Sequence, residues 1–201
     1  MIVLLILCHP IGTNKELILS LSSHYSAINQ GDTLNFRKPT LKMKTIVIED
    51  KQRIESIILQ ADACFVGMVD LEGNPYVVPM NFGYENDILY LHSGPEGGKI
   101  EMLQRNNNVC ITFSLGHKLV YQHKQVACSY SMRSESAMCR GKVEFIEDME
   151  EKRRALDIIM RHYTKDQFGY SDPAVRNVKV WKVPVDQMTG KVFGLRADEK
   201  P

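Results

Sequence analysis

The segment HSGPEGGKIEML, residues 92–103, combines titratable side chains with glycines where an apolar helical pattern begins. Gly94, Gly97 and Gly98 allow the backbone to approach a ligand closely. The first N–H groups of the following helix lie at its positive end, which suits a phosphate, and Lys99 adds a point charge there. Two interpretations stay open from these residues alone: a phosphate-binding loop, or a polar strand-to-helix turn with a solvated lysine.

Several other chemistries are not indicated. A nucleotide-hydrolysing loop needs GxxxxGK followed by Ser or Thr, but Ser93 stands where the first glycine belongs and Ile100 follows Lys99. The GxGxxG pattern of dinucleotide-binding folds is absent. No two histidines have HxH or HxxxH spacing, so no metal site is expected. No GxSxG elbow accompanies the serines, so a hydrolase triad has no support.

Two more polar groups are candidates. His92 ends the strand before the loop, and a structural and a catalytic role are both open. The stretch CSYSMRSES, residues 128–136, is dense in hydroxyls. Alternation along a strand places Ser134 and Ser136 on one face and Arg133 and Glu135 on the other. These groups suit a groove that binds a phosphate or a polar ring edge, or they face solvent.

The hydrophobic period predicts the elements that position these groups. Helical spacing predicts helices within residues 49–62, 96–107 and 148–164. Apolar runs between Gly, Asn and Asp turns predict strands at 64–69, 76–84, 88–92, 108–119 and 177–185, with one or two more within 126–148. Pro79 marks an edge, a bulge or a strand end. Six or seven strands without a βαβ rhythm predict a mainly β fold, an antiparallel barrel with helices packed outside.

Composition narrows the class of protein. The 201 residues are 44% hydrophobic and 24% charged, with a net charge of +1, so a nucleic-acid binder with its basic excess is not expected. The five cysteines form no CxxC pair, and most lie in apolar runs. We expect buried free thiols and a reducing, cytoplasmic location without a membrane anchor.

The chain divides into three parts by its pattern. Residues 1–42 are expected to form an extension outside the main domain, residues 43–195 the domain itself, and residues 196–201 a tail. The apolar run of MIVLLILCHP has no Lys or Arg before it and is too short to cross a bilayer. The alternative is a native N-terminal strand and helix that pack on the domain.

Several motifs in order resemble one family. They are PYVVPMNFGY at residues 75–84, LHSGPEGGK at 91–99, RNNNVC at 105–110, EFIEDMEEKRRAL at 144–156 and MTGK at 188–191. From about residue 43 to residue 195 the chain resembles the pyridoxamine-5′-phosphate-oxidase-like flavoproteins, and within them the 5-nitroimidazole-resistance (Nim) branch. The resemblance implies a six- to seven-stranded antiparallel split barrel of the FMN-binding type.

The resemblance also implies a site. FMN, with FAD as the alternative, is expected at the interface of a homodimer, with its ring against the backbone of Val78, Pro79, Met80 and Asn81. Its phosphate is expected near His92, Ser93, Gly98 and Lys99, with further contacts from Arg133 and Ser136. The resemblance suggests a catalytic role for His92. Family members commonly carry arginine where this chain has Glu135, so Arg133 or Arg140 would have to supply that charge.

Two functions follow from this resemblance. The first is a flavin-dependent oxidoreductase of Nim type that passes electrons to a small acceptor such as a nitroaromatic. The second is a non-catalytic module that binds or senses flavin, or haem, on the same fold. No side chains are expected to form a metal site, and no nucleic acid or membrane partner is expected.

Overall fold

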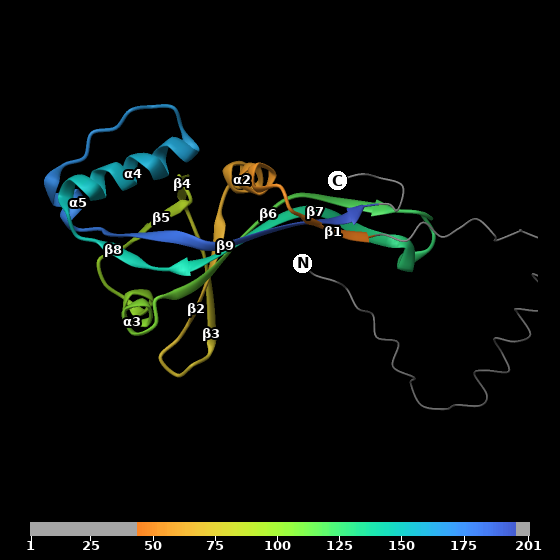
Figure 1. Cartoon of the computed structure of the whole chain (residues 1–201), viewed down its shortest axis with the longest axis horizontal. Coiled ribbons are helices and arrows are strands. Elements are labelled where there is room, and N and C mark those ends of the chain that lie inside the picture. Colours follow the sequence, from red (N-terminus) through yellow and green to blue (C-terminus); the bar gives the residue numbers. More distant parts are fainter. Residues whose placement is uncertain (1–43, 196–201) are drawn as a thin grey trace, which may run out of the picture. The chain divides into compact units, whose positions relative to one another are not determined.

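A computed structural model describes residues 44–195 of the chain (Figure 1). The expected N-terminal extension and C-terminal tail lie outside the described residues. No helix within residues 44–195 is long and apolar enough to cross a membrane.

Nine antiparallel strands form one sheet in the described part of the chain, and seven of them follow the order β3-β2-β6-β7-β9-β5-β4. Their bounds are β1 Lys44–Ile48, β2 Cys64–Val69, β3 Pro75–Met80, β4 Gly83–Glu85, β5 Ile88–Ser93, β6 Asn108–Tyr121, β7 Tyr130–Lys142, β8 Glu144–Ile146 and β9 Lys179–Leu195. The predicted class, a mainly β split barrel, is confirmed. The strand count is higher than predicted because β1 was not predicted and because the single strand predicted at residues 76–84 is two strands, β3 and β4.

The long strand β9 explains how the sheet closes on itself without forming a complete barrel. Its first part, Lys179 to Pro184, pairs with β5, and residues within it also pair with β8. Its second part, Val185 to Phe193, pairs with β7 and is joined there by β1. The strands at the two ends of the order, β3 and β4, have no pairing with each other among the described residues.

Four α-helices lie outside the sheet in the described residues: α2 Lys51–Gln60, α3 Gly98–Arg105, α4 Met149–Tyr163 and α5 Asp172–Arg176. Helix α2 begins where Asp50 accepts a bond from the backbone N–H of Gln52, and α4 begins where Asp148 accepts bonds from Glu150 and Glu151. These helices confirm the three predicted ones. Helix α5 was not predicted because its five residues are too few to show a period.

The core has two parts. The larger part fills the barrel and includes the fully buried side chains of Phe82, Phe113 and Trp181. The smaller part lies between α4 and the sheet, where Ile158 and Ile159 pack against Tyr90. Consecutive residues of β5 alternate between these two parts, which decides where the polar residues at the end of β5 point.

The cysteines only partly follow the prediction of buried thiols. Cys64 and Cys139 are buried and free, Cys110 is half-buried, and Cys128 is exposed. The exposure of Cys128 contradicts the prediction because this residue belongs to a short 3-10 turn, Ala127–Ser129, rather than to a strand. Cys8 lies outside the described residues.

Candidate functional site

The N-terminus of α3 is shaped for an anion. Gly97 occupies the N-cap position with φ of 125°, a conformation that side chains with a Cβ rarely adopt. No side chain of the described residues caps the helix. The first N–H groups of α3, at Gly98 and Lys99, therefore lie at the positive end of the helix with no side-chain acceptor.

Ser93 and Lys99 flank this helix start. Ser93 is the last residue of β5, and its hydroxyl donates to the Gly94 carbonyl over 2.8 Å, so its oxygen can still accept a bond. The side chain of Lys99 is half-buried and makes no ion pair with a carboxylate within residues 44–195. A partly desolvated ammonium without a carboxylate favours an anionic ligand.

The strand β3 lies at the edge of the sheet because β2 is its single partner among the described strands, so of the alternatives that Pro79 left open the edge is present, and Pro79 also lies near the end of β3. Alternate N–H and C=O groups on the outer side of β3 therefore have no strand partner. This exposed backbone, from Val78 to Asn81, is the feature that could hold the polar edge of a planar ring. The side chains of Val78 and Met80 point inward to the barrel core.

The outer face of this part of the sheet is a platform of apolar and hydroxyl side chains. Strand alternation and the pairing register place on one side Val77 and Pro79 from β3, Phe65 from β2, Thr112 and Ser114 from β6, and Ser136 from β7. Phe65 and Val77 are exposed by 47% and 60%. Sequence reasoning missed Phe65 because the continuous apolar run CFVGMV does not distinguish the outer face of β2 from its inner face.

The structure separates Arg133 from Ser136. The two residues are three positions apart on the regular part of β7, so their side chains lie on opposite faces of the sheet. Arg140 shares the face of Ser136 and is exposed. Glu135, on the opposite face, pairs with Arg53 of α2 over 2.9 Å. The glutamate that replaces the family's arginine is thus matched by a cation that sequence reasoning missed.

His92 and Ser93 also point to opposite faces. Tyr90, two positions before His92, packs in the core beneath α4, so His92 lies on that side of β5. The imidazole is half-buried, its Nδ1 atom has no hydrogen-bond partner within the described residues, and burial lowers its pKa.

The loop and the edge strand belong to the same region of the domain. Helix α3 contacts β2, and Arg105 at its end donates to the Leu71 carbonyl in the turn before β3. The end of α3 therefore lies beside the turn that joins β2 and β3.

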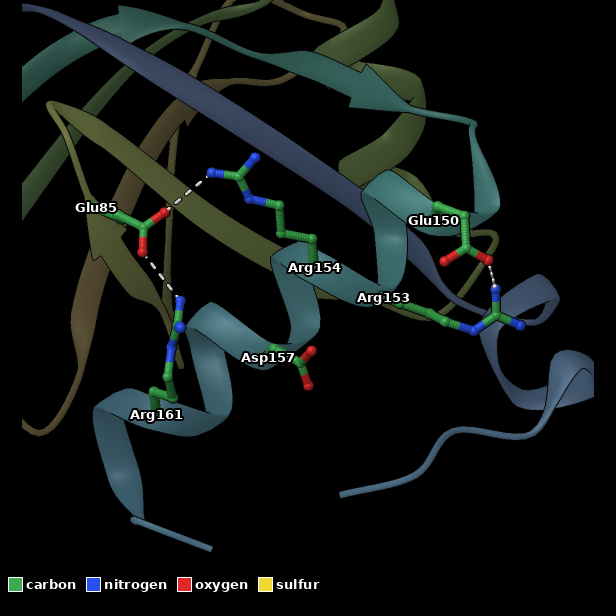
Figure 2. Close-up of a pocket in the computed structure, with 6 residues that line it drawn as sticks. All are labelled: Glu85, Glu150, Arg153, Arg154, Asp157 and Arg161. Carbon is green, nitrogen blue, oxygen red and sulfur yellow. Dashed lines mark hydrogen bonds and ion pairs between the residues drawn. The ribbon is translucent and has the colours of Figure 1, made fainter. Parts of the chain in front are cut away.

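A hollow on the described part of the chain lies away from these groups. It has a volume of about 420 Å³ and lies beside α4, where Arg154 and Arg161 both donate to Glu85 over 3.3 and 3.0 Å (Figure 2). Its lining consists of charged side chains, most of them in ion pairs, and contains none of the predicted site residues. We therefore place the candidate site at α3 and β3, because the residues there suit a phosphate and the polar edge of a ring.

The comparisons with known proteins agree on one family. The family model described as pyridoxamine 5′-phosphate oxidase matches residues 50–192. A candidate 5-nitroimidazole antibiotic resistance protein from Bacteroides thetaiotaomicron VPI-5482 is 94% identical, with a TM-score of 0.71, over 79% of this chain and 93% of that one. No curated protein sequence gives a significant match.

More distant structures share the fold. A flavocytochrome from Azotobacter vinelandii has a TM-score of 0.66 at 22% identity, over 77% of this chain and 72% of that one. An FAD- and haem-binding protein from Mycobacterium smegmatis has a TM-score of 0.67 at 18% identity, over 77% and 76%. The matched motifs, the open antiparallel barrel and these comparisons together show that the chain belongs to the pyridoxamine 5′-phosphate oxidase family.

Proposed function

We propose that this chain binds FMN, with FAD as the alternative, and acts as a flavin-dependent oxidoreductase that passes electrons to a small acceptor such as a nitroaromatic. The uncapped start of α3, with Gly97 at positive φ and the half-buried Lys99, is the observation that carries the proposal. The 94% identical protein of Bacteroides thetaiotaomicron, with its candidate role in nitroimidazole resistance, supports the choice of acceptor.

The residues of the chain would bind, orient and shield the cofactor. Lys99 and the first N–H groups of α3 would hold the phosphate, with Ser93 as a further contact. The unpaired backbone of β3 would orient the ring, and Phe65 and Val77 would exclude water from one side of it. The flavin supplies the redox chemistry, and the protein supplies position and electrostatics.

The phosphate contact can be tested with Lys99→Ala. Loss of a charge-assisted hydrogen bond should weaken FMN binding by about 1.5–3 kcal/mol, measured by quenching of flavin fluorescence. Lys51→Ala is the matched control because Lys51 is an exposed lysine of α2, a helix that pairs through Arg53 with Glu135 on the face opposite the platform, and it should leave the affinity unchanged. Equal affinities for the two variants would remove Lys99 from the site.

We further propose a homodimer with the flavin at the interface, because the edge strand β3 and the apolar platform are both exposed in a single chain. The dissociation constant of the dimer should therefore fall when FMN is added. Sedimentation equilibrium with and without FMN measures this shift. A monomer that binds FMN at full strength contradicts the proposed arrangement.

The position of His92 supports a second candidate, a module that binds flavin or haem without turnover. Its imidazole lies on the opposite face of β5 from Ser93, which leaves the phosphate loop without a titratable acid or base from β5. Bound flavin that is reduced by NAD(P)H and reoxidised by a nitroimidazole supports the enzyme. If His92→Gln then retains flavin but loses turnover, His92 is a reacting group. Bound flavin that no donor reduces supports the module.

A further inference from the structure

The hairpin of β6 and β7 extends beyond the strands that flank it. Strand β2 pairs with β6 at residues 110–112, and β9 pairs with β7 from Ser134 onward, but β6 and β7 stay paired out to Tyr121 and Tyr130. We call residues 116–133 the arm, seen in green at the right of Figure 1. An isolated two-stranded ribbon is marginally stable in water, so the arm favours a surface on which it can pack.

The arm is apolar and basic. Its exposed large apolar side chains are Leu119, Tyr121, Val126 and Met132, with Leu119 exposed by 59%. Its charged residues are Lys118, Lys124 and Arg133, and it contains no Asp or Glu. A bulge between Leu115 and Lys118, with Gly116 at φ of 68°, bends the hairpin where the arm begins.

The β2–β3 hairpin, residues 64–80, has the complementary character. It also exposes large apolar side chains, which are Phe65, Val69, Leu71, Tyr76 and Val77. Its charged residues are Asp70 and Glu72, and it contains no Lys or Arg. Arg105 of α3 donates a hydrogen bond to the Leu71 carbonyl and so brings one positive charge to the turn. Asp70 and Glu72 outnumber it, so the surface around the turn keeps an excess of negative charge.

We propose that the arm of each chain packs on the β2–β3 hairpin of a second copy. Both surfaces are exposed in one chain, and they extend in different directions from the sheet (Figure 1). Opposite charges and exposed apolar side chains on the two surfaces match each other, and in a two-fold dimer the same contact forms twice. The inference deepens the proposed homodimer, because the partner's arm would then cover the edge strand β3 and so complete the flavin site.

Charge reversal and a charge swap test this contact in the full-length chain. Lys118→Glu and Glu72→Lys should each weaken the dimer about tenfold or more, since each places like charges in two symmetric contacts. Combined in one chain, the two changes bring opposite charges together again and should restore most of the affinity. Leu119→Ser should also weaken the dimer about tenfold. Sedimentation equilibrium measures the dissociation constants, and circular dichroism checks that each variant is folded.

Two control variants separate the arm from general surface effects. Leu59→Ser changes an apolar residue of α2 that is exposed by 54%, and Lys165→Glu reverses an exposed charge in the segment after α4. Both should leave the dimer unchanged. A chain that is monomeric at every concentration, or a dimer that none of the arm and hairpin variants weakens, overturns the proposed contact. Arm-dependent dimers that never bind flavin would instead refute the proposed function and leave this contact standing.

Discussion

The ion pair between Arg53 and Glu135 allows a direct test of why a glutamate stands at position 135, where the family resemblance implies arginine. Glu135→Arg introduces the charge that this resemblance leads one to expect. In this structure the new arginine would face Arg53, whose Nη2 atom now lies 2.9 Å from the Glu135 carboxylate. We therefore expect the substitution to destabilise the fold, not to improve the site.

The magnitude follows from the exposure of the pair. The two side chains are 40% and 31% exposed, so the ion pair itself contributes about 1 kcal/mol. Like charges about 4 Å apart add ~1 kcal/mol of repulsion at the dielectric constant of water. The free energy of unfolding should fall by about 2 kcal/mol, which lowers Tm by roughly 4–8 °C in a domain of this size.

Urea unfolding of three variants tests this reasoning. Glu135→Arg should lower the midpoint at constant m value, and the swap Arg53→Glu with Glu135→Arg should recover at least about half of the loss. Asp186→Arg, an equal charge change at an exposed residue of β9, should stay within about 0.5 kcal/mol of the parent. An unchanged stability of Glu135→Arg, or a swap no better than the single variant, would refute a direct pair.

Three further outcomes are expected. Gly97→Ala should lower the free energy of unfolding in urea by about 1–3 kcal/mol because Gly97 has φ of 125°. Gly94→Ala is the control and should cost little, since an added Cβ there meets only the Glu96 carbonyl at 3.9 Å. Equal losses in the two variants would contradict the role of the positive φ. Burial lowers the pKa of His92 below 6.5, so the midpoint of its NMR titration should lie below that value. The stability that the neutral imidazole contributes above pH 6.5 should be lost as the pH falls through the lowered pKa. A titration midpoint at or above 6.5 would refute this burial. Burial raises the pKa of Cys64 and of Cys139 to about 12, so at pH 8 a thiol reagent should modify exposed Cys128 quickly and these two thiols only after unfolding. The free energy of unfolding should also decline as the pH rises from about 9 toward 12, because the thiols of the unfolded chain ionise first. Rapid labelling of Cys64 in the native protein would contradict its burial.

The sequence predicts the parts of this molecule that local chemistry controls. Asp148 and the apolar stripe of α4 predict that helix, and Pro79 predicts an edge, a bulge or a strand end, because caps, periodicity and a missing N–H act within a few residues. The glycines around Lys99 likewise predict the loop before α3. Short strands such as β1 and β8 have too few residues for a period, and they form because β9 offers a free edge.

Side-chain direction at the site depends on tertiary packing instead. Alternation places His92 and Ser93 on opposite faces, but the face that α4 covers is known only from the packing of Tyr90 with Ile158. The partner of Glu135 is 82 residues away along the chain, in α2, and no local pattern links the two. Contacts of this range require the assembled sheet.

The last strand has a consequence for synthesis of the protein in the cell. Strand β9 ends the described domain at Leu195 and pairs with β1, β5, β7 and β8, all of which leave the ribosome before it. Until β9 emerges, β5 and β7 expose unpaired edges, which are a risk for aggregation. Folding of the sheet therefore completes late, and a message truncated before residue 179 would yield a chain without the strand that joins its two halves.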